Sequence, residues 1–288
     1  MADLAANLRR HIDVLAELIG ERNTSRPSAL ELARRYLRSE LTAMELVVAE
    51  TPFETHVRSA LNLEVVLPGS KPAKSTLVIG AHYDSAAGTP GADDNASAVA
   101  TLLEIARDLS GRKLKRKTRL VFYDCEEPPH FNLGEMGTHF HAIQMRRNGE
   151  KLLGMICLES LGYFGECQKF IKPPWPLRLL DSIIGPRYLI VVSNVASIPF
   201  GVRFVTKLFT SGKLPIFPAA LPVKWVPDIA LSDHRGYWEQ GFRALMITNT
   251  AHLRNPNYHT ANDRLETLNI DRLTKACRQI QTAVRRLL

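Results

Sequence analysis

The fold of this chain is decided by residues 77–100, LVIGAHYDSAAGTPGADDNASAVA. The stretch opens with a short apolar run, 77–81, whose length and β-branched content predict a buried strand. His82 follows directly, at the carboxyl end of the strand, where open α/β sheets place their ligand sites. A loop of small residues then leads to Asp93 and Asp94 at the start of a helical pattern. This order predicts one half of a metal site, although a packed core histidine and a helix-capping aspartate would produce the same pattern.

Strand and helix patterns alternate along the rest of the chain. Because the strand at 77–81, the helix at 99–109 and the strand at 120–123 are consecutive, we expect a right-handed crossover with parallel strands. The predicted fold class is therefore α/β, a three-layer α/β/α sandwich with a mostly parallel central sheet, in one domain over residues 1–288. Further strands are expected at 47–48, 61–67, 155–158, 188–192 and 244–248, and further helices at 8–19, 30–41 and 270–287.

A segment rich in proline and aromatic residues, at about 196–230, interrupts this alternation. We expect it to form a helix and an irregular loop that covers the pocket, not a separate domain. Its large side chains would then give the pocket an apolar wall, although the same side chains would also suit a hydrophobic core. They are Phe200, Phe204, Phe209, Phe217 and Trp225.

The composition is that of an ordinary globular protein, with 288 residues, 45% hydrophobic and 23% charged. No apolar run reaches the roughly 18 residues that span a bilayer, so no membrane segment is expected. The first residues, MADLAANLRRHIDVL, lack the order of a signal peptide, which favours a cytoplasmic location. No feature of the sequence indicates an oligomeric state.

The net charge of +8 raises the question of nucleic-acid binding. The one dense basic run, 112–117, lies between a helix and a strand pattern, where a solvated turn is expected. Because no aromatic interleaving or nucleic-acid motif accompanies it, nucleic acid is not expected as a partner. The cysteines form no CxxC pair and are expected to be packed thiols; they are Cys125, Cys157, Cys167 and Cys277.

Acidic residues and histidines follow successive predicted strands. They are His82, Asp93, Glu126 with Glu127, Glu159 and, in a loop-like stretch near the end of the sequence, His259. The carboxyl ends of parallel strands share one edge of a sheet, so these side chains can converge. Imidazole and carboxylate are ligands that zinc accepts readily. Two histidines and three acidic ligands suit a pair of divalent metals with one bridging carboxylate.

The same residues lie in five short motifs that occur in a specific order. The motifs are AHYDS (81–85), GADDNAS (91–97), DCEE (124–127), LES (158–160) and YHTANDRLETL (258–268). In sequence and order they resemble the zinc aminopeptidases of the M28 family, and the resemblance extends over most of the chain. It implies a zinc-dependent exopeptidase that releases amino-terminal residues, with two zinc ions per chain and a peptide with a free amino terminus as substrate.

The resemblance also implies a role for each matching residue. His82, Asp93 and Glu159 would hold one zinc, and Asp93, Glu127 and His259 the other, so Asp93 would be the bridge. Many family members have aspartate where Glu159 stands. The resemblance further implies a cis peptide bond between Asp93 and Asp94.

Catalytic roles follow in the same way. Glu126, which stands beside a ligand, would be the general base, and Tyr258 would hydrogen-bond the developing oxyanion, although a packing role suits Tyr258 too. Asp84 would orient the His82 imidazole, and Asp263 would do the same near His259. Residues 232–234, Ser-Asp-His, would be scaffolding of the pocket, and the remaining histidines in the core or at the surface.

Two other functions fit part of this pattern. Glutaminyl cyclases are related transferases that use a similar set on one zinc, here Asp93, Glu127 and His259, so metal stoichiometry separates them from the aminopeptidases. A non-catalytic binding relative is the other alternative. It is disfavoured because a scaffold needs no general base at Glu126.

Overall fold

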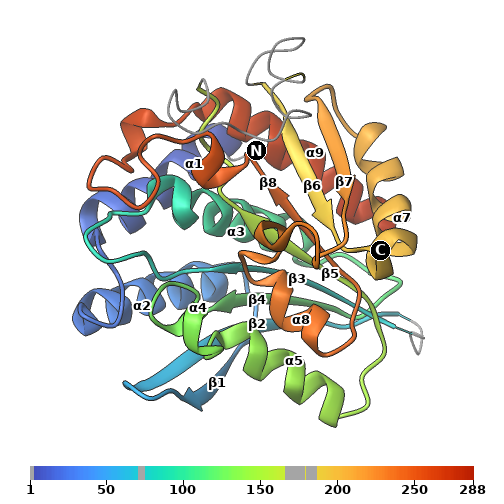
Figure 1. Ribbon diagram of the computed structural model, residues 1–288, viewed down its shortest axis with the longest axis horizontal. Coiled ribbons are helices and arrows are strands. Elements are labelled where there is room, and N and C mark those ends of the chain that lie inside the picture. The colour runs from blue at the N-terminus through green and yellow to red at the C-terminus, as the bar shows by residue number, and fades with distance from the viewer. Residues whose placement is uncertain (1–2, 71–74, 166–178, 180–186) are drawn as a thin grey trace.

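An eight-stranded sheet forms the middle layer of the computed structural model, which describes residues 3–70, 75–165, 179 and 187–288 (Figure 1). The strands are β1 (Val48–Glu54), β2 (Ser59–Leu67), β3 (Thr76–His82), β4 (Thr118–Tyr123), β5 (Leu152–Glu159), β6 (Leu189–Ser193), β7 (Ile216–Ala220) and β8 (Ala244–Thr248). Their order across the sheet is β1-β2-β4-β3-β5-β8-β6-β7. Strands β4, β3, β5 and β8 are parallel to one another, whereas β2 and β6 run against their neighbours in this group.

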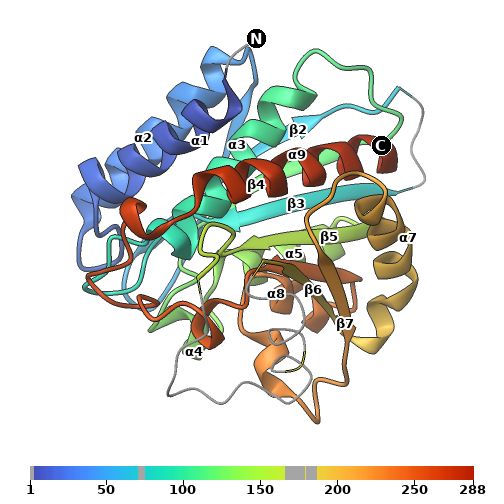
Figure 2. The same ribbon diagram turned by 90° about the horizontal axis from the view of Figure 1, so that it is seen from above.

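Helices cover both faces of the sheet, as Figure 2 shows from above. They are α1 (Leu4–Ile12), α2 (Pro27–Ala43), α3 (Ala98–Leu109), α4 (His130–Leu133), α5 (Gly137–Arg147), α7 (Ile198–Phe209), α8 (His234–Glu239) and α9 (Ile270–Leu287). Helices α1, α2, α3, α7 and α9 share one apolar core with the sheet, and α5 and α8 share the core on the opposite face. The predicted three-layer α/β/α fold is confirmed.

The sequence patterns explain where the helices form. Helix α2 begins at Pro27, which suits the first helical position because its missing N–H would have no partner there. Helix α1 continues into a π-helical segment, Asp13–Ile19, and the chain then turns at Gly20, whose φ is +77°. On α9, apolar residues at helical spacing are buried, including Leu273, Cys277 and Ile280. Among the described residues, no helix is both long and apolar enough to cross a membrane.

Residues 198–220 match the expectation only in part, since a helix was expected here but a strand was not. They form α7 and β7, and β7 pairs with β6 at the edge of the sheet that lies farthest from β1. Phe200 and Phe204 belong to the core beneath α7, where Gly154 makes room for the Phe200 ring. Trp225 is 78% exposed and forms no wall. The hydrophobic effect places the rings of Phe200 and Phe204 in the core, whereas Phe209 is 51% exposed, and β7 widens the sheet.

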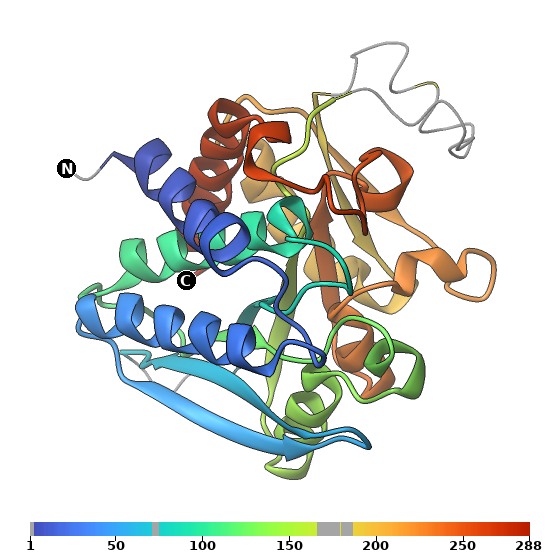
Figure 3. The ribbon, with the colours of Figure 1, turned by 90° about the vertical axis from the view of Figure 1, so that its left-hand side faces the viewer.

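Strand β3 lies near the middle of the sheet, and its last residue, His82, belongs to the predicted site. All its residues are buried, because parallel neighbours flank it and helices cover both faces. Its carboxyl end lies at the same edge as those of β4, β5 and β8. Figure 3 faces this edge, where the loop after β3 meets the segment that precedes α9. A backbone hydrogen bond of 3.1 Å from Ala92 N–H to the carbonyl of Asp263 joins the two segments.

Candidate metal centre

One carboxylate, that of Asp94, lies between two imidazoles. Its Oδ1 is 3.3 Å from Nε2 of His82, at the end of β3. Its Oδ2 is 3.1 Å from Nε2 of His259, in the loop before α9. His82 is 1% exposed and Asp94 2% exposed, whereas the side chain of His259 is 32% exposed, so this three-residue row runs from the buried end of β3 toward solvent. A single carboxylate facing two imidazoles has the layout of a bridging ligand.

Each imidazole also faces a carboxylate of its own. Glu159 Oε2, at the end of β5, lies 3.3 Å from Nε2 of His82. Glu127 Oε2, in the turn after β4, lies 3.1 Å from Nε2 of His259. The cluster therefore has two similar halves that share Asp94, and we call these five residues the carboxylate–histidine cluster.

The donors of the cluster fit zinc in type and spacing. Two ligands of a tetrahedral zinc ion, each at about 2.0–2.1 Å, are about 3.3 Å apart, close to the distances within each half. One ligand atom each from His82, Asp94 and Glu127 lies within 4.8 Å of the other two. Glu127 Oε1 is buried and has no hydrogen-bond partner among the described residues. A buried carboxylate oxygen without a donor is the atom that a cation would satisfy.

The ionisable groups of the cluster shift one another's pKa values. Burial opposes the charged form of His82, but Glu126, Asp84, Asp94 and Glu159 outweigh it and raise the pKa of the imidazole. His259 behaves in the same way, with a pKa of about 10. Burial and the charge of Asp94 raise the pKa of Glu127 to about 7. Strongly shifted pKa values among side chains that face one another are typical of a metal or catalytic site.

Asp93, expected as the bridge, faces away from both imidazoles. Its Oδ1 accepts hydrogen bonds from the N–H groups of Gly162 at 2.7 Å and Tyr163 at 3.1 Å. Its Oδ2 accepts from the side-chain amides of Asn249 at 2.8 Å and Asn255 at 3.0 Å. With both oxygens engaged in this way, Asp93 holds three loops together, and Asp94 takes the central position instead.

The cis peptide bond is also one residue further along than expected. It joins Asp94 to Asn95, not Asp93 to Asp94. Asp263, expected near the His259 imidazole, instead accepts hydrogen bonds from the backbone N–H groups of Asp93 at 2.9 Å and Asp94 at 3.1 Å. Asp263 therefore fixes the backbone that presents Asp94.

Asp84 lies where the sequence places it. Its Oδ1 is 3.4 Å from Nδ1 of His82, on the opposite side of the ring from Asp94. Its two oxygens also accept from the backbone N–H groups of Glu126 at 3.2 Å and Glu127 at 3.1 Å. One carboxylate thus orients a ring of the cluster and holds the turn that carries two further acidic residues.

Glu126 and Tyr258 border the cluster without joining it. Glu126 Oε2 lies 3.8 Å from Nε2 of His82, and burial, together with Glu127 and Glu159, raises the pKa of Glu126 despite the opposing charge of His82. The Tyr258 ring stacks on His259, with centroids 3.9 Å apart. Burial and then the charges of the nearby carboxylates raise the pKa of the Tyr258 phenol. Tyr258 therefore stays protonated and able to donate.

Two serines hold Glu159. Ser160 Oγ donates to Glu159 Oε1 at 2.9 Å, and Ser232 Oγ donates to Oε2 at 2.8 Å. Through this hydrogen bond of Ser232, the segment 221–233 contacts the cluster. His234 lies away from the cluster and bonds the Ile229 carbonyl at 2.6 Å, which agrees with a scaffolding role for this segment. Sequence reasoning assigned no partner to Ser232, because a serine carries no metal-ligand signal.

Arg22 holds the loop after β3 and is completely buried. Its guanidinium donates to the carbonyls of Tyr83 at 2.7 Å and Gly91 at 2.9 Å, and also to that of Pro90. It reaches the carbonyl of Leu15 as well, at 3.2 Å. Burial lowers the pKa of Arg22 to about 10. The segment before α2 thus anchors the loop that leads to Asp94.

The other histidines and the cysteines have structural positions. His130, His139 and His141 are buried, and His252 is half-buried beside the Tyr258 ring. Cys125, Cys157 and Cys277 are free and buried, as expected, and Cys167 lies outside the described residues.

Asp124, directly before the turn of Glu126, forms a buried ion-pair network. Its carboxylate accepts from Arg34 at 2.7 Å and from Arg58 at 2.6 Å and 3.0 Å. Burial disfavours the ionised form, but Arg58 and Arg34 outweigh it and lower the pKa of Asp124. The network fastens α2 and the β1–β2 turn to the carboxyl end of β4.

We expect Asp124→Asn to lower the free energy of unfolding by about 2–4 kcal/mol at pH 7, because it leaves two largely buried guanidiniums without their anion. A lowered folded-state pKa contributes stability above the unfolded value of about 3.9 and loses it as the pH falls. The difference in unfolding free energy between the wild type and Asp124→Asn should therefore shrink as the pH falls from 5 to 3. Urea unfolding at fixed zinc concentration measures it, with exposed Asp228→Asn as the matched control. An equal deficit at both pH values would contradict the assignment.

Comparison with known proteins places the chain in a family. The model of peptidase family M28 matches residues 62–284. The uncharacterized protein YfbL of Escherichia coli (strain K12) is 37% identical over 207 residues, which cover 69% of this chain and 63% of YfbL. A probable leucine aminopeptidase of Trichophyton verrucosum (strain HKI 0517) is 26% identical over 229 residues, covering 74% of this chain and 53% of that protein.

The fold is shared with a solved structure. The structure of BSAP, a zinc aminopeptidase from Bacillus subtilis, superposes with a TM-score of 0.77 at 14% identity, covering 98% of this chain and 95% of that chain. This chain spans between about half and two thirds of the length of the two curated relatives. Since the family model covers most of the sequence, from β2 to the last helix, this protein belongs to peptidase family M28.

Proposed function

We propose that the protein is a zinc aminopeptidase with two metal ions, which hydrolyses the amino-terminal peptide bond of its substrate. The observation that carries the proposal is the position of Asp94 between the imidazoles of His82 and His259. His82, Asp94 and Glu159 would hold one zinc ion. Asp94, Glu127 and His259 would hold the other.

The zinc ions and the side chains of the protein would have different roles in the reaction. Zinc, when bound, supplies a Lewis acid that polarises the scissile carbonyl and makes water nucleophilic near neutral pH. The Glu126 carboxylate accepts a proton from the attacking water and delivers it to the departing amine. The Tyr258 phenol donates a hydrogen bond to the carbonyl oxygen as negative charge develops on it. Asp84 holds the backbone of Glu126, which keeps the base in position.

Two features favour an aminopeptidase over the alternatives. Both halves of the cluster are complete, whereas a one-zinc cyclase needs only the half that contains Glu127 and His259. Glu126 adds a buried acid that belongs to neither half of the cluster, and a binding module would have no use for it. The leucine aminopeptidase relative supports an amino-terminal substrate.

Metal analysis joined to activity measurement tests the proposal. After reconstitution and dialysis, we expect about two zinc ions per chain and hydrolysis of aminoacyl anilides such as leucine p-nitroanilide. A chelator should remove both zinc and activity, and added zinc should restore them. The amino-acetylated anilide is the control and should not be cleaved. One zinc per chain with cyclisation of amino-terminal glutamine would instead identify a glutaminyl cyclase.

A further inference from the structure

A concave site built from other residues lies at the same edge of the sheet as the carboxylate–histidine cluster, where β8 ends and β6 and β7 begin. Arg187 precedes β6, Lys213 precedes β7, and α9 contributes further residues. Since β6 runs antiparallel to β8, and β7 parallel to β6, the starts of β6 and β7 lie at the edge where β8 ends. We call this site the α9 pocket.

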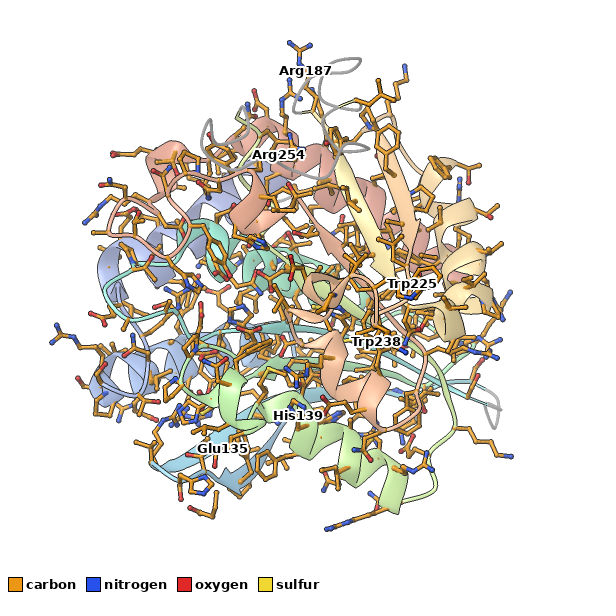
Figure 4. The ribbon with its side chains drawn as sticks, viewed as in Figure 1. Glu135, His139, Arg187, Trp225, Trp238 and Arg254 are labelled. Carbon is orange, nitrogen blue, oxygen red and sulfur yellow. The ribbon has the colours of Figure 1, made fainter. Side chains whose placement is uncertain are left out.

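Five cationic side chains line the α9 pocket, and none of its lining residues within the described part of the chain is acidic. They are Arg187, Lys213, Arg272, Lys275 and Arg278, around a cavity of about 600 Å³. None of the five forms an ion pair with a carboxylate among the described residues. Arg187 points outward at the top of the molecule in Figure 4. Arg272 packs over the Phe164 ring, 5.8 Å from its centroid.

Two of the cations, Arg187 and Arg272, lie close enough to repel one another. Burial and then the charge of Arg187 lower the pKa of Arg272. Lys275 and Arg278 lie one helical turn apart on the exposed face of α9, so they point the same way. Like charges that converge on one cavity raise the local positive potential and attract an anion.

A second basic pocket provides the contrast. Arg112, Lys113, Lys115, Arg285 and Arg286 line it, and its volume is about 510 Å³. Here Asp108 pairs with Arg112 at 3.1 Å and with Arg285 at 2.6 Å. The two pockets have the same number of cations, but only the second is partly neutralised within the described structure.

We propose that the α9 pocket binds a small soluble polyanion that carries two or more phosphate groups. Guanidiniums match phosphate oxygens with paired donors, and lysine adds a compact charge, so the three arginines and two lysines suit this chemistry. The cavity has the volume of a small-molecule site and exceeds what one phosphate fills. Five cations that no carboxylate of the described residues neutralises favour a ligand with several negative charges.

Calorimetric titration of the zinc-loaded protein with inorganic triphosphate tests the inference. We expect Lys275→Glu/Arg278→Glu to weaken binding at least about tenfold, because two attractions become repulsions. Lys275→Arg/Arg278→Lys should bind within about threefold of the wild type, since the charges remain. The matched control is Arg112→Glu/Lys113→Glu, which makes the same change in net charge in the other basic pocket and should bind within about twofold.

Three results would overturn the inference. One is unchanged affinity in Lys275→Glu/Arg278→Glu, and another is an equal loss in the Arg112 and Lys113 control, which would mean a general charge effect. The third comes from repeating the titration after removal of zinc, because triphosphate can also bind a metal. Binding that disappears with the zinc would belong to the metal centre. Thermal unfolding of each variant verifies that these exposed positions leave the fold intact.

Discussion

Glu126→Gln should lower kcat for an aminoacyl anilide by about 10²–10⁴-fold and leave the zinc content unchanged. The amide keeps the size of the side chain but cannot accept the proton of the attacking water. Glu126 is 3.8 Å from the nearest imidazole nitrogen and belongs to neither half of the cluster, so the metals should remain. Steady-state kinetics and zinc analysis on the same sample measure both effects.

A matched variant separates loss of the base from loss of charge. Glu266→Gln makes the same change at an exposed position and should keep wild-type kinetics. If Glu126→Gln lost zinc together with activity, Glu126 would be a ligand. If it kept full activity, Glu126 would not be the base.

Asp94→Asn should remove at least one of the two zinc ions and lower activity at least about 10³-fold. Asp94 is the residue shared by both halves of the cluster, and an amide is a much poorer ligand than a carboxylate. It would also leave two imidazoles facing each other without the anion that separates them. Zinc analysis after dialysis and anilide hydrolysis measure the two losses.

The neighbouring variant Asp93→Asn should behave differently. It replaces an acceptor of four N–H hydrogen bonds from two other loops, so we expect a loss of about 2–4 kcal/mol in unfolding free energy. At low temperature the folded fraction should still bind two zinc ions. If Asp93→Asn lost zinc and Asp94→Asn kept it, Asp93 would be the bridge after all.

The sequence alone does not distinguish which of Asp93 and Asp94 is the bridging residue. Asp93 and Asp94 are chemically identical neighbours, and both stand before a helical pattern. Their roles are set by the backbone, because Asp94 has the non-helical φ and ψ of −106° and 91°. That path is fixed from far along the chain, because Asp263 accepts a hydrogen bond from the N–H of Asp93 and the side-chain amides of Asn249 and Asn255 donate to the Asp93 carboxylate. No local pattern contains this information.

Elsewhere the sequence was more informative. His82, Glu127 and Glu159 lie at the ends of strands or in the turns that follow them, and the period of apolar residues locates those strands directly. Strand β7 was missed because its sequence, IFPAA, contains Pro218, and proline argues against a central strand. As an edge strand, β7 tolerates a residue with no N–H to donate.

Arg22 has a consequence for how the molecule opens. Its guanidinium ties the end of the first helical segment to the loop after β3 through carbonyls of Leu15, Tyr83 and Gly91. If that loop moved alone, the buried Arg22 guanidinium would lose the carbonyls that accept its hydrogen bonds, at a large cost in free energy. We therefore expect the loop and the amino-terminal helices to open as one cooperative unit. Metal release that requires the loop to move would then be as slow as the partial unfolding of that unit.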